Sequence, residues 1–186
     1  MRSPCKKGMV LLVALAMLAG CAGVQVSQDY DPQAASYRYG TWQWGEPSQP
    51  ATGDLRVDNP FLNDRIRQAI ENHLAGRNIV QSLQPDLYLS YRLTIQPKIQ
   101  SYTSYPTLGA GYYSYPWYGG YDADTQVYQY DECQLTIDIK AADTKSLLWR
   151  GTGIYRLKTY NTPDAAAADM QETVDRILAQ FPPAEK

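Results

Sequence analysis

Cys21 is the residue whose position most clearly predicts a chemical modification. It follows a positively charged start and an apolar run over residues 9–18, in the order typical of a secretory leader. Ten helical residues span about 15 Å, roughly half of a bilayer core, so this run is too short for a transmembrane helix. The small residues Ala19 and Gly20 lie just before the cysteine. Cleavage after them would leave Cys21 as a new N-terminal residue with a thiol available for modification.

The four residues Leu18-Ala19-Gly20-Cys21 resemble the bacterial lipobox, which the lipoprotein signal peptidase cuts before the cysteine. The resemblance implies a diacylglyceryl thioether on Cys21, usually with an acylated amino group. Two or more acyl chains hold a protein stably on a membrane, since each buried methylene contributes about 0.8 kcal/mol. Ala22 is not Asp; in a Gram-negative cell the resemblance then implies the outer membrane, with the domain facing the periplasm. The alternative is a plain secreted protein with a chance cysteine after its leader.

Charge and cysteine content narrow the classes of partner. Residues 1–20 carry three of the 17 basic residues, so the mature chain has 14 bases against 19 acids, a net charge of −5. It has no run of Lys or Arg, which argues against nucleic-acid binding because phosphate contacts need clustered positive charge. Cys5 leaves with the leader and Cys21 carries lipid, so Cys133 has no partner for an intrachain disulfide.

Few side chains are placed to do chemistry. His73 is the chain's single histidine, and no acid or nucleophile is placed beside it by the sequence, so we expect it to pack at the core boundary. Cys133 lies on the apolar side of a predicted strand and is expected to behave as a small buried hydrophobe. Asp122 and Asp124 lack the spacing of a calcium loop, and we predict no metal and no cofactor. No phosphate loop or nucleophile elbow is present.

A Tyr-rich segment over residues 102–121 is the most unusual stretch of the chain. Aromatic residues there are spaced by Gly and Pro without a period, which predicts a long loop between two strands. One interpretation is an aromatic platform that binds a protein partner or stacks on glycan rings. The other is a low-complexity insertion. The residues expected to make contacts under the first interpretation are Tyr113, Tyr115, Trp117 and Tyr118.

Hydrophobic patterning predicts one two-layer α+β domain over residues 35–183, preceded by a signal peptide (1–20) and by the lipidated cysteine with its tether (21–34). Asn59-Pro60 and Thr162-Pro163 each start a one-sided helix, with the first ending at a left-handed Gly76. Pro97 is expected to end its strand or to lie on a sheet edge. The expected order is β-α-β-β-β-α, with a mostly antiparallel sheet and strands at residues 37–44, 86–96, 130–140 and 147–157.

Short motifs along the mature chain are similar to those of bacterial lipoproteins that carry domain of unknown function 4136 (DUF4136). Cys133 and Ala141 depart from the usual Gly and acid at their positions. The resemblance implies location and architecture and brings no activity. The motifs are Asp29-Tyr30-Asp31-Pro32, Thr41-Trp42-Gln43-Trp44, Asn59-Pro60, Pro85-Asp86-Leu87, Leu135-Thr136-Ile137-Asp138-Ile139, Leu147-Leu148-Trp149-Arg150-Gly151 and Phe181-Pro182-Pro183.

From these observations we expect a non-enzymatic envelope lipoprotein whose periplasmic domain binds or braces other envelope components, protein first and glycan second. The alternative is an envelope hydrolase that acts on glycan with carboxylates converging only in the fold. Two facing carboxylates in a cleft, one with a raised pKa, would favour this alternative.

Overall fold

A six-stranded sheet forms one layer of the protein. The computed structural model describes residues 23–32, 39–45, 49–104 and 124–182. The strands lie in the order β1-β6-β5-β4-β2-β3; the pairings of β2 with β3 and β4 are parallel, and the others are antiparallel. This confirms the predicted α+β class with a mostly antiparallel sheet. The strands are β1 (Gln25–Tyr30), β2 (Thr41–Trp44), β3 (Val80–Gln81), β4 (Leu87–Ser104), β5 (Asp124–Ala141) and β6 (Leu147–Arg156).

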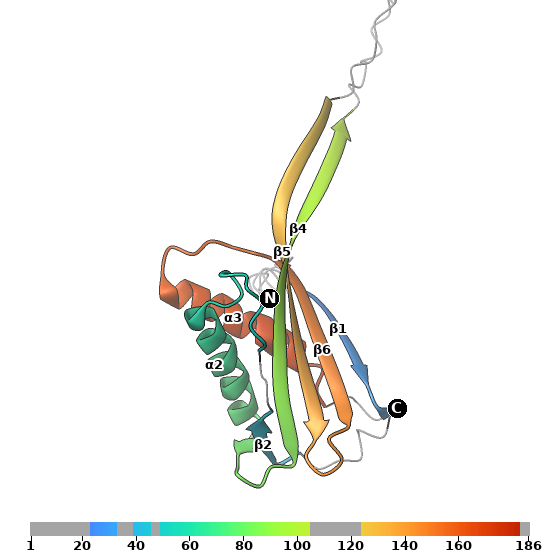
Figure 1. The fold of residues 1–186 in the computed structure, drawn as a ribbon, viewed down its shortest axis with the longest axis vertical. Coiled ribbons are helices and arrows are strands. Elements are labelled where there is room, and N and C mark those ends of the chain that lie inside the picture. The colour runs from blue at the N-terminus through green and yellow to red at the C-terminus, as the bar shows by residue number, and fades with distance from the viewer. Residues whose placement is uncertain (1–22, 33–38, 46–48, 105–123, 183–186) are drawn as a thin grey trace, which may run out of the picture.

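Two helices, α2 (Pro60–Gly76) and α3 (Pro163–Leu178), form the second layer and cover one face of the sheet (Figure 1). Their predicted starts are confirmed. Asn59 Oδ1 accepts from the Phe61 backbone N–H at 3.0 Å, and Thr162 Oγ1 accepts from the Ala165 N–H at 3.2 Å. Among the described residues, no helix is both long and apolar enough to cross a membrane.

The end of α2 differs from the prediction. Gly76 is the last helical residue, with no left-handed backbone, and Arg77 caps the helix. The left-handed residue is Asn78, with φ of 60°. Asparagine tolerates this conformation better than most residues because its short polar side chain bonds locally. The turn is therefore made two residues later than the glycine indicated.

The core lies between the helices and the inward face of the sheet. Alternate residues of β4 and β5 point toward α2 and α3, as their strict alternation predicted. Because inward and outward residues alternate, the opposite face of these strands carries polar side chains. The fully buried side chains at the centre are Leu87, Leu89, Leu93, Leu135, Ile137 and Ile139 from the sheet and Ile66, Ile70, Leu74, Val174 and Ile177 from the helices.

Strand β1 lies where the sequence predicted part of a tether, so that part of the prediction was wrong. The lipidated cysteine and its tether were expected over residues 21–34, but Gln25–Tyr30 pairs along β6 at the edge of the sheet. Val26 and Tyr30 of this strand pack against the core, as does Val24 just before it. Only residues 22–24 lie between Cys21 and β1.

Strand β6 buries two consecutive large residues, a point that its sequence left open. Leu148 and Trp149 are both buried, although neighbours on a regular strand point to opposite faces. The pairing of β5 with β6 is irregular between Ile139 and Lys140, where Ile139 lies opposite Trp149 but Lys140 lies opposite Leu147. This β-bulge lets both side chains turn inward.

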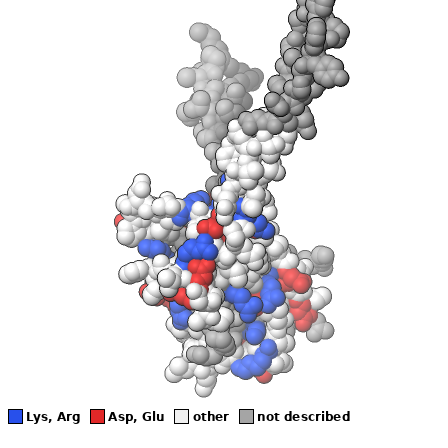
Figure 2. Space-filling model, turned by 45° about the horizontal axis from the view of Figure 1, so that its top comes forward, with Lys and Arg blue, Asp and Glu red and all other residues white. Residues whose placement is uncertain are grey.

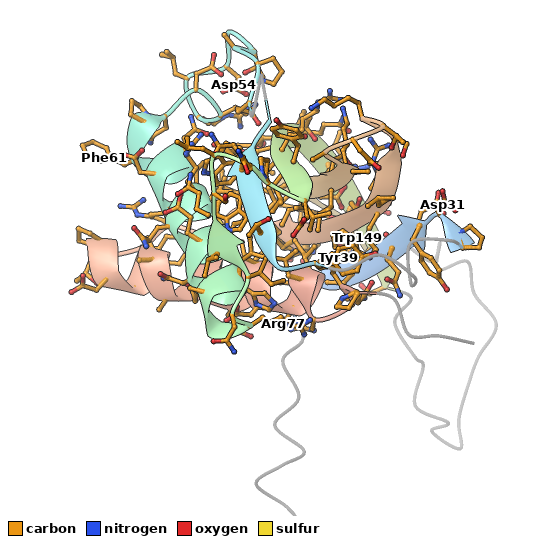
Figure 3. All side chains as sticks on the ribbon, turned by 90° about the horizontal axis from the view of Figure 1, so that it is seen from below. Asp31, Tyr39, Asp54, Phe61, Arg77 and Trp149 are labelled. Carbon is orange, nitrogen blue, oxygen red and sulfur yellow. The ribbon has the colours of Figure 1, made fainter. Side chains whose placement is uncertain are left out.

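An aromatic cluster closes the core at the end of α3. The Trp149 and Phe181 ring centroids are 5.5 Å apart, and the Tyr39 ring centroid lies 4.9 Å from that of Phe181. Figure 3 shows Trp149 and Tyr39 near each other. The indole N–H of Trp149 donates to Gln28 Oε1 of β1 at 2.9 Å. Phe61, by contrast, points away from the body at the start of α2. Trp149 thus connects the edge strand to the centre of the molecule.

Asp86 joins the start of β4 to β2. Its Oδ2 accepts from the backbone N–H of Thr41 at 2.8 Å, from the Thr41 hydroxyl at 2.8 Å and from the Gly40 N–H at 3.1 Å. The Thr41 side-chain bond, followed by the backbone bonds, lowers the pKa of this carboxyl. Hydrogen bonds to the charged form favour it, so these contacts are stronger when Asp86 is ionised.

A pH-dependent loss of stability follows from Asp86. Because its folded pKa lies below its unfolded pKa of about 3.9, its contribution is complete above that value and is lost as the pH falls through the folded pKa. We expect the wild type to lose more unfolding free energy than Asp86→Asn between about pH 7 and pH 3. Urea unfolding at both pH values measures this, and equal losses in the two proteins would contradict it.

Candidate functional site

The two helices leave the outward face of the sheet uncovered (Figure 1). The outward polar residues predicted for β4 line it, together with residues of β5 and β6. Because β4, β5 and β6 are neighbours in the sheet, these side chains form one continuous groove. We call it the outer-face groove, and its lining residues are Pro50, Ser90, Tyr91, Arg92, Thr94, Gln96, Gln134, Thr136, Asp138, Lys140, Arg150 and Thr152.

A bidentate ion pair organises the middle of the outer-face groove. Arg150 Nε donates to Asp138 Oδ1 at 2.6 Å, and Nη2 donates to Oδ2 at 2.7 Å, across the β5–β6 pairing. The bond to Asp138 raises the pKa of Arg150. Planar fork-to-fork geometry holds both side chains in defined positions. Asp138 lies on the outward face of the sheet, directly opposite Arg150.

The charge of this groove is opposite to that of the whole chain. Its lining contains three basic side chains, Arg92, Lys140 and Arg150, against the single acid Asp138. The hydroxyls of Thr136 and Thr152, which also line the groove, lie 3.4 Å apart. A polar surface with a net excess of positive charge is complementary to an acidic partner surface.

A second groove lies beside the last residues of β6. Arg156 stacks over the Tyr130 ring at 4.0 Å and donates to Gln100 Oε1 at 2.8 Å. Lys98 pairs with Glu132 at 3.4 Å on the same face of the sheet. The start of β1 forms the opposite wall, because Gly23, Val24 and Gln25 also line the groove.

Beyond this second groove, β4 and β5 continue alone as a two-stranded projection (Figure 1). We call residues 97–104 and 124–131 the β4–β5 arm. Its base is next to Glu132, because Glu132 is the first β5 residue that pairs with β6 and residues 124–131 pair with β4 alone. The predicted strands over 86–96 and 130–140 are therefore too short. Tyr102, expected in a loop, pairs with Gln126. Pro97 does not end its strand and lies where β4 is an edge, the second of its two expected positions.

Several predicted site residues lie outside the described residues. These include Cys21 with the cleavage residues Leu18, Ala19 and Gly20, and the aromatic residues Tyr113, Tyr115, Trp117 and Tyr118. The same holds for Asp122, whereas Asp124 begins β5. Their predicted roles therefore stay predictions.

Cys133 is buried on the inward face of β5, as its position predicted. It lines a small apolar cavity beneath Tyr155 and Met170. Burial, and secondarily the charge of Asp131, raises the pKa of its thiol to about 11. The thiolate is the reactive form of cysteine, so this environment keeps the side chain inert near neutral pH.

We therefore expect Cys133 to resist thiol reagents in the native protein and to react readily after unfolding in urea. Absorbance with a disulfide reagent, followed with and without denaturant, measures the two rates. Because the thiol is reached only when the core opens, the native rate should follow the fraction of open molecules. A fast native reaction at the rate of a free thiol would contradict the burial.

His73 has an acidic partner that the sequence did not place. Its Nδ1 lies 2.7 Å from Asp175 Oδ1, so the pair connects α2 to α3. Gln171 joins the same contact by donating to the Ala69 carbonyl and to Asp175. The histidine is mostly buried, and its interaction is one of helix-to-helix packing. The predicted boundary position is therefore confirmed, with Asp175 as the partner.

A partly buried polar cluster is centred on Asp169 of α3. Burial alone would raise the pKa of this carboxyl, but donation from Lys158 and from the Tyr160 hydroxyl outweighs burial and lowers it. Burial and the bond to Asp169 raise the pKa of Tyr160. Each of these groups is held in its ordinary charge state, the anion for Asp169 and the neutral phenol for Tyr160.

The described carboxylates do not show the pattern that would favour a glycan hydrolase. Those with a displaced pKa are Asp54, Asp58, Asp86 and Asp169, and in each case the net shift is downward. A general acid needs the opposite shift. Within the described part of the chain, no group of three or more His, Cys, Asp or Glu side chains is arranged to hold a metal ion.

These features define a class of protein: a two-layer α+β domain with one helix-covered face, one open polar face and a projecting two-stranded arm. Residues 26–183 match the family described as "Domain of unknown function (DUF4136)", so the chain belongs to this family. The family resemblance seen in the sequence is thereby confirmed. Among curated proteins, none matches this chain.

This chain resembles two proteins of known structure at low sequence identity. A PDZ domain protein from Parabacteroides distasonis is 14% identical with a TM-score of 0.49; the match covers 95% of this chain and 40% of that one. The PelC dodecamer from Paraburkholderia phytofirmans is 13% identical with a TM-score of 0.49; it covers 84% of this chain and 95% of that one. This chain therefore spans well under half of the first of these proteins.

Proposed function

We propose that this protein is an outer-membrane lipoprotein, anchored through lipid on Cys21, whose periplasmic domain is a non-catalytic binding or scaffolding module for an envelope protein. The observation that carries the binding role is the outer-face groove. Its side chains are held by the Arg150–Asp138 pair, and no helix of the described chain covers them. A rigid polar face of this kind binds by complementarity, with acidic groups on the partner facing Arg92 and Lys140.

A protein partner is favoured over a glycan because three aromatic rings near the surface are each covered on one face by a cationic side chain. Sugar rings stack on open aromatic faces, but three rings near the surface already carry a cation on one face. Arg156 lies over Tyr130 at 4.0 Å, Lys145 over Tyr88 at 3.7 Å and Arg67 over Trp44 at 4.3 Å. Each such contact contributes about 0.5–1 kcal/mol, which a stacking sugar would have to replace.

The anchor has a direct test. Metabolic labelling with palmitate is expected to mark the wild-type protein and to leave Cys21→Ala unlabelled. Fractionation is expected to find the wild type with outer membranes and the variant in the soluble periplasm, because a single acyl chain or none holds a protein only weakly. Equal labelling of both proteins would overturn the anchor at Cys21.

The binding role is tested by photocrosslinking in cells from matched glutamine positions. A photoreactive residue in place of Gln134, on the outer face, should capture a defined partner, whereas one in place of Gln68, exposed on α2, should not. Arg92→Glu combined with Lys140→Glu should abolish the capture, since the charge complementarity is reversed. Equal capture from both positions, or capture that survives the charge reversal, would contradict the proposal.

A further inference from the structure

We propose that the β4–β5 arm lies on the lipid surface to which Cys21 is anchored, as a second membrane contact of the same protein. The inference rests on the proposed lipid anchor and extends it. It follows from the position at which β1 begins, from the length of the arm and from the side chains that the arm exposes.

Strand β1 begins at the end of the sheet from which the arm projects. Residues aligned across the sheet are Gln25 of β1, Ile154 of β6, Gln134 of β5 and Thr94 of β4. This row lies on the arm side of the sheet, away from the end where β5 turns into β6, so the first residue of β1 is close to the base of the arm. Figure 1 shows β1 beginning beside the base of the arm.

The arm reaches further than the linker to the anchor. Cys21 is four residues before Gln25, so the linker spans at most about 14 Å. Ser104 is ten residues beyond Thr94, which places the end of β4 about 34 Å beyond the same row. The membrane surface thus passes within the reach of the arm. A two-stranded ribbon has unpaired edge groups that cannot enter hydrocarbon, so the arm lies along the interface and does not span the bilayer.

The composition of the arm suits the membrane interface. Residues 99–104 and 125–130 contain no charged side chain. Its exposed apolar and aromatic residues are Ile99 (73% exposed), Val127 (63%), Tyr102 (54%) and Tyr128 (52%).

The two faces of the arm are both suited to lipid contact. Ile99 and Val127 share one face, whereas the Tyr102 and Tyr128 rings pair on the other at 5.9 Å. Tyrosine prefers the headgroup level, where its ring is in apolar surroundings and its hydroxyl is hydrated. Charged side chains instead gather on the body and at the base of the arm (Figure 2), and residues 99–104 and 125–130 carry none.

The test uses the lipidated full-length protein, purified from cells and reconstituted into vesicles of phosphatidylethanolamine and phosphatidylglycerol. An environment-sensitive fluorophore is attached at Ser101→Cys on the arm or, as the matched control, at Ala75→Cys near the end of α2. Both positions are exposed, and the buried Cys133 does not compete for the label. Nitroxide-bearing lipid is expected to quench the arm label several-fold more strongly than the α2 label.

Charge on the arm should remove this contact. Ile99→Glu combined with Val127→Glu is expected to reduce quenching at the arm position to the control level, while Leu83→Glu at an exposed site on the body leaves it unchanged. Circular dichroism checks that each variant is folded. Quenching that survives the double charge substitution would overturn the arm contact.

The other outcomes of this experiment distinguish failure of the arm contact from failure of the lipid anchor. Protein that floats with the vesicles but shows weak quenching at both positions overturns the arm contact and leaves the anchor intact. Protein that does not float overturns both. Energy transfer between labelled arms without quenching by lipid would assign the arm to a second copy of the chain and would also overturn the proposal.

Discussion

Replacing Gly151 by alanine is expected to lower the free energy of unfolding by about 3 kcal/mol, the upper part of the usual range for overpacking. A Cβ at this position would lie 2.1 Å from Trp149 Cη2 and 2.7 Å from Ile177 Cγ2. The nearest atom belongs to a rigid buried ring, so the clash cannot be relieved by rotating a flexible chain end. The neighbouring strand and α3 would have to move apart instead.

The matched control is Gly76→Ala, because a Cβ there meets no atom within 4 Å and the residue is helical. That substitution should stabilise the protein by about 0.5–1 kcal/mol, since alanine loses less backbone entropy than glycine on folding. Urea unfolding followed by circular dichroism measures both. A Gly151→Ala protein as stable as the wild type would show that α3 does not pack this closely on β6.

Trp149→Ala is expected to cost about 3–5 kcal/mol, a large share of the stability of a domain of this size. The side chain is fully buried, packs against Phe181 and Gly151, and donates its indole N–H to Gln28. The substitution would open a cavity and leave the Gln28 amide without this partner. Because Gln28 lies in β1, amide exchange should rise along that strand more than along β4.

An exposed leucine provides the control for Trp149. Leu55→Ala should change stability by no more than about 0.5 kcal/mol, because this side chain is largely exposed. The double variant Trp149→Ala with Gly151→Ala tests the coupling directly. Its cost should be clearly smaller than the sum of the two single costs, since the ring that blocks the new Cβ is gone. Additive costs would mean that the two residues do not share the site.

Local signals in the sequence predicted the elements that have local causes. The caps at Asn59 and Thr162 each depend on one side chain and a backbone N–H a few residues away, and both are confirmed. The alternation in β4 and β5 reflects burial of every second residue, so it predicted the core faces correctly. The end of α2 was missed because asparagine as well as glycine can take the left-handed turn.

The edge strand and the arm were missed for a different reason. In β1 one of the inward positions is the polar residue Gln28, which interrupts the apolar alternation. Its side chain accepts from the indole N–H of Trp149, 121 residues away, and nothing in the sequence indicated this contact. The alternation of Val24, Val26 and Tyr30 was the available signal. The arm has no packed face, so its strands carry no hydrophobic period and its pairing is visible only in the hydrogen-bonded register.

By itself, the sequence determined the α+β class, the helix starts and the buried faces of the central strands, because each depends on residue types within a few positions of one another. Only the tertiary structure decided which strands are neighbours, which sheet face stays open and that β1 begins at the base of the arm. These features come from contacts between distant segments, such as β1 with β6, and no local pattern encodes which distant partner a strand will find.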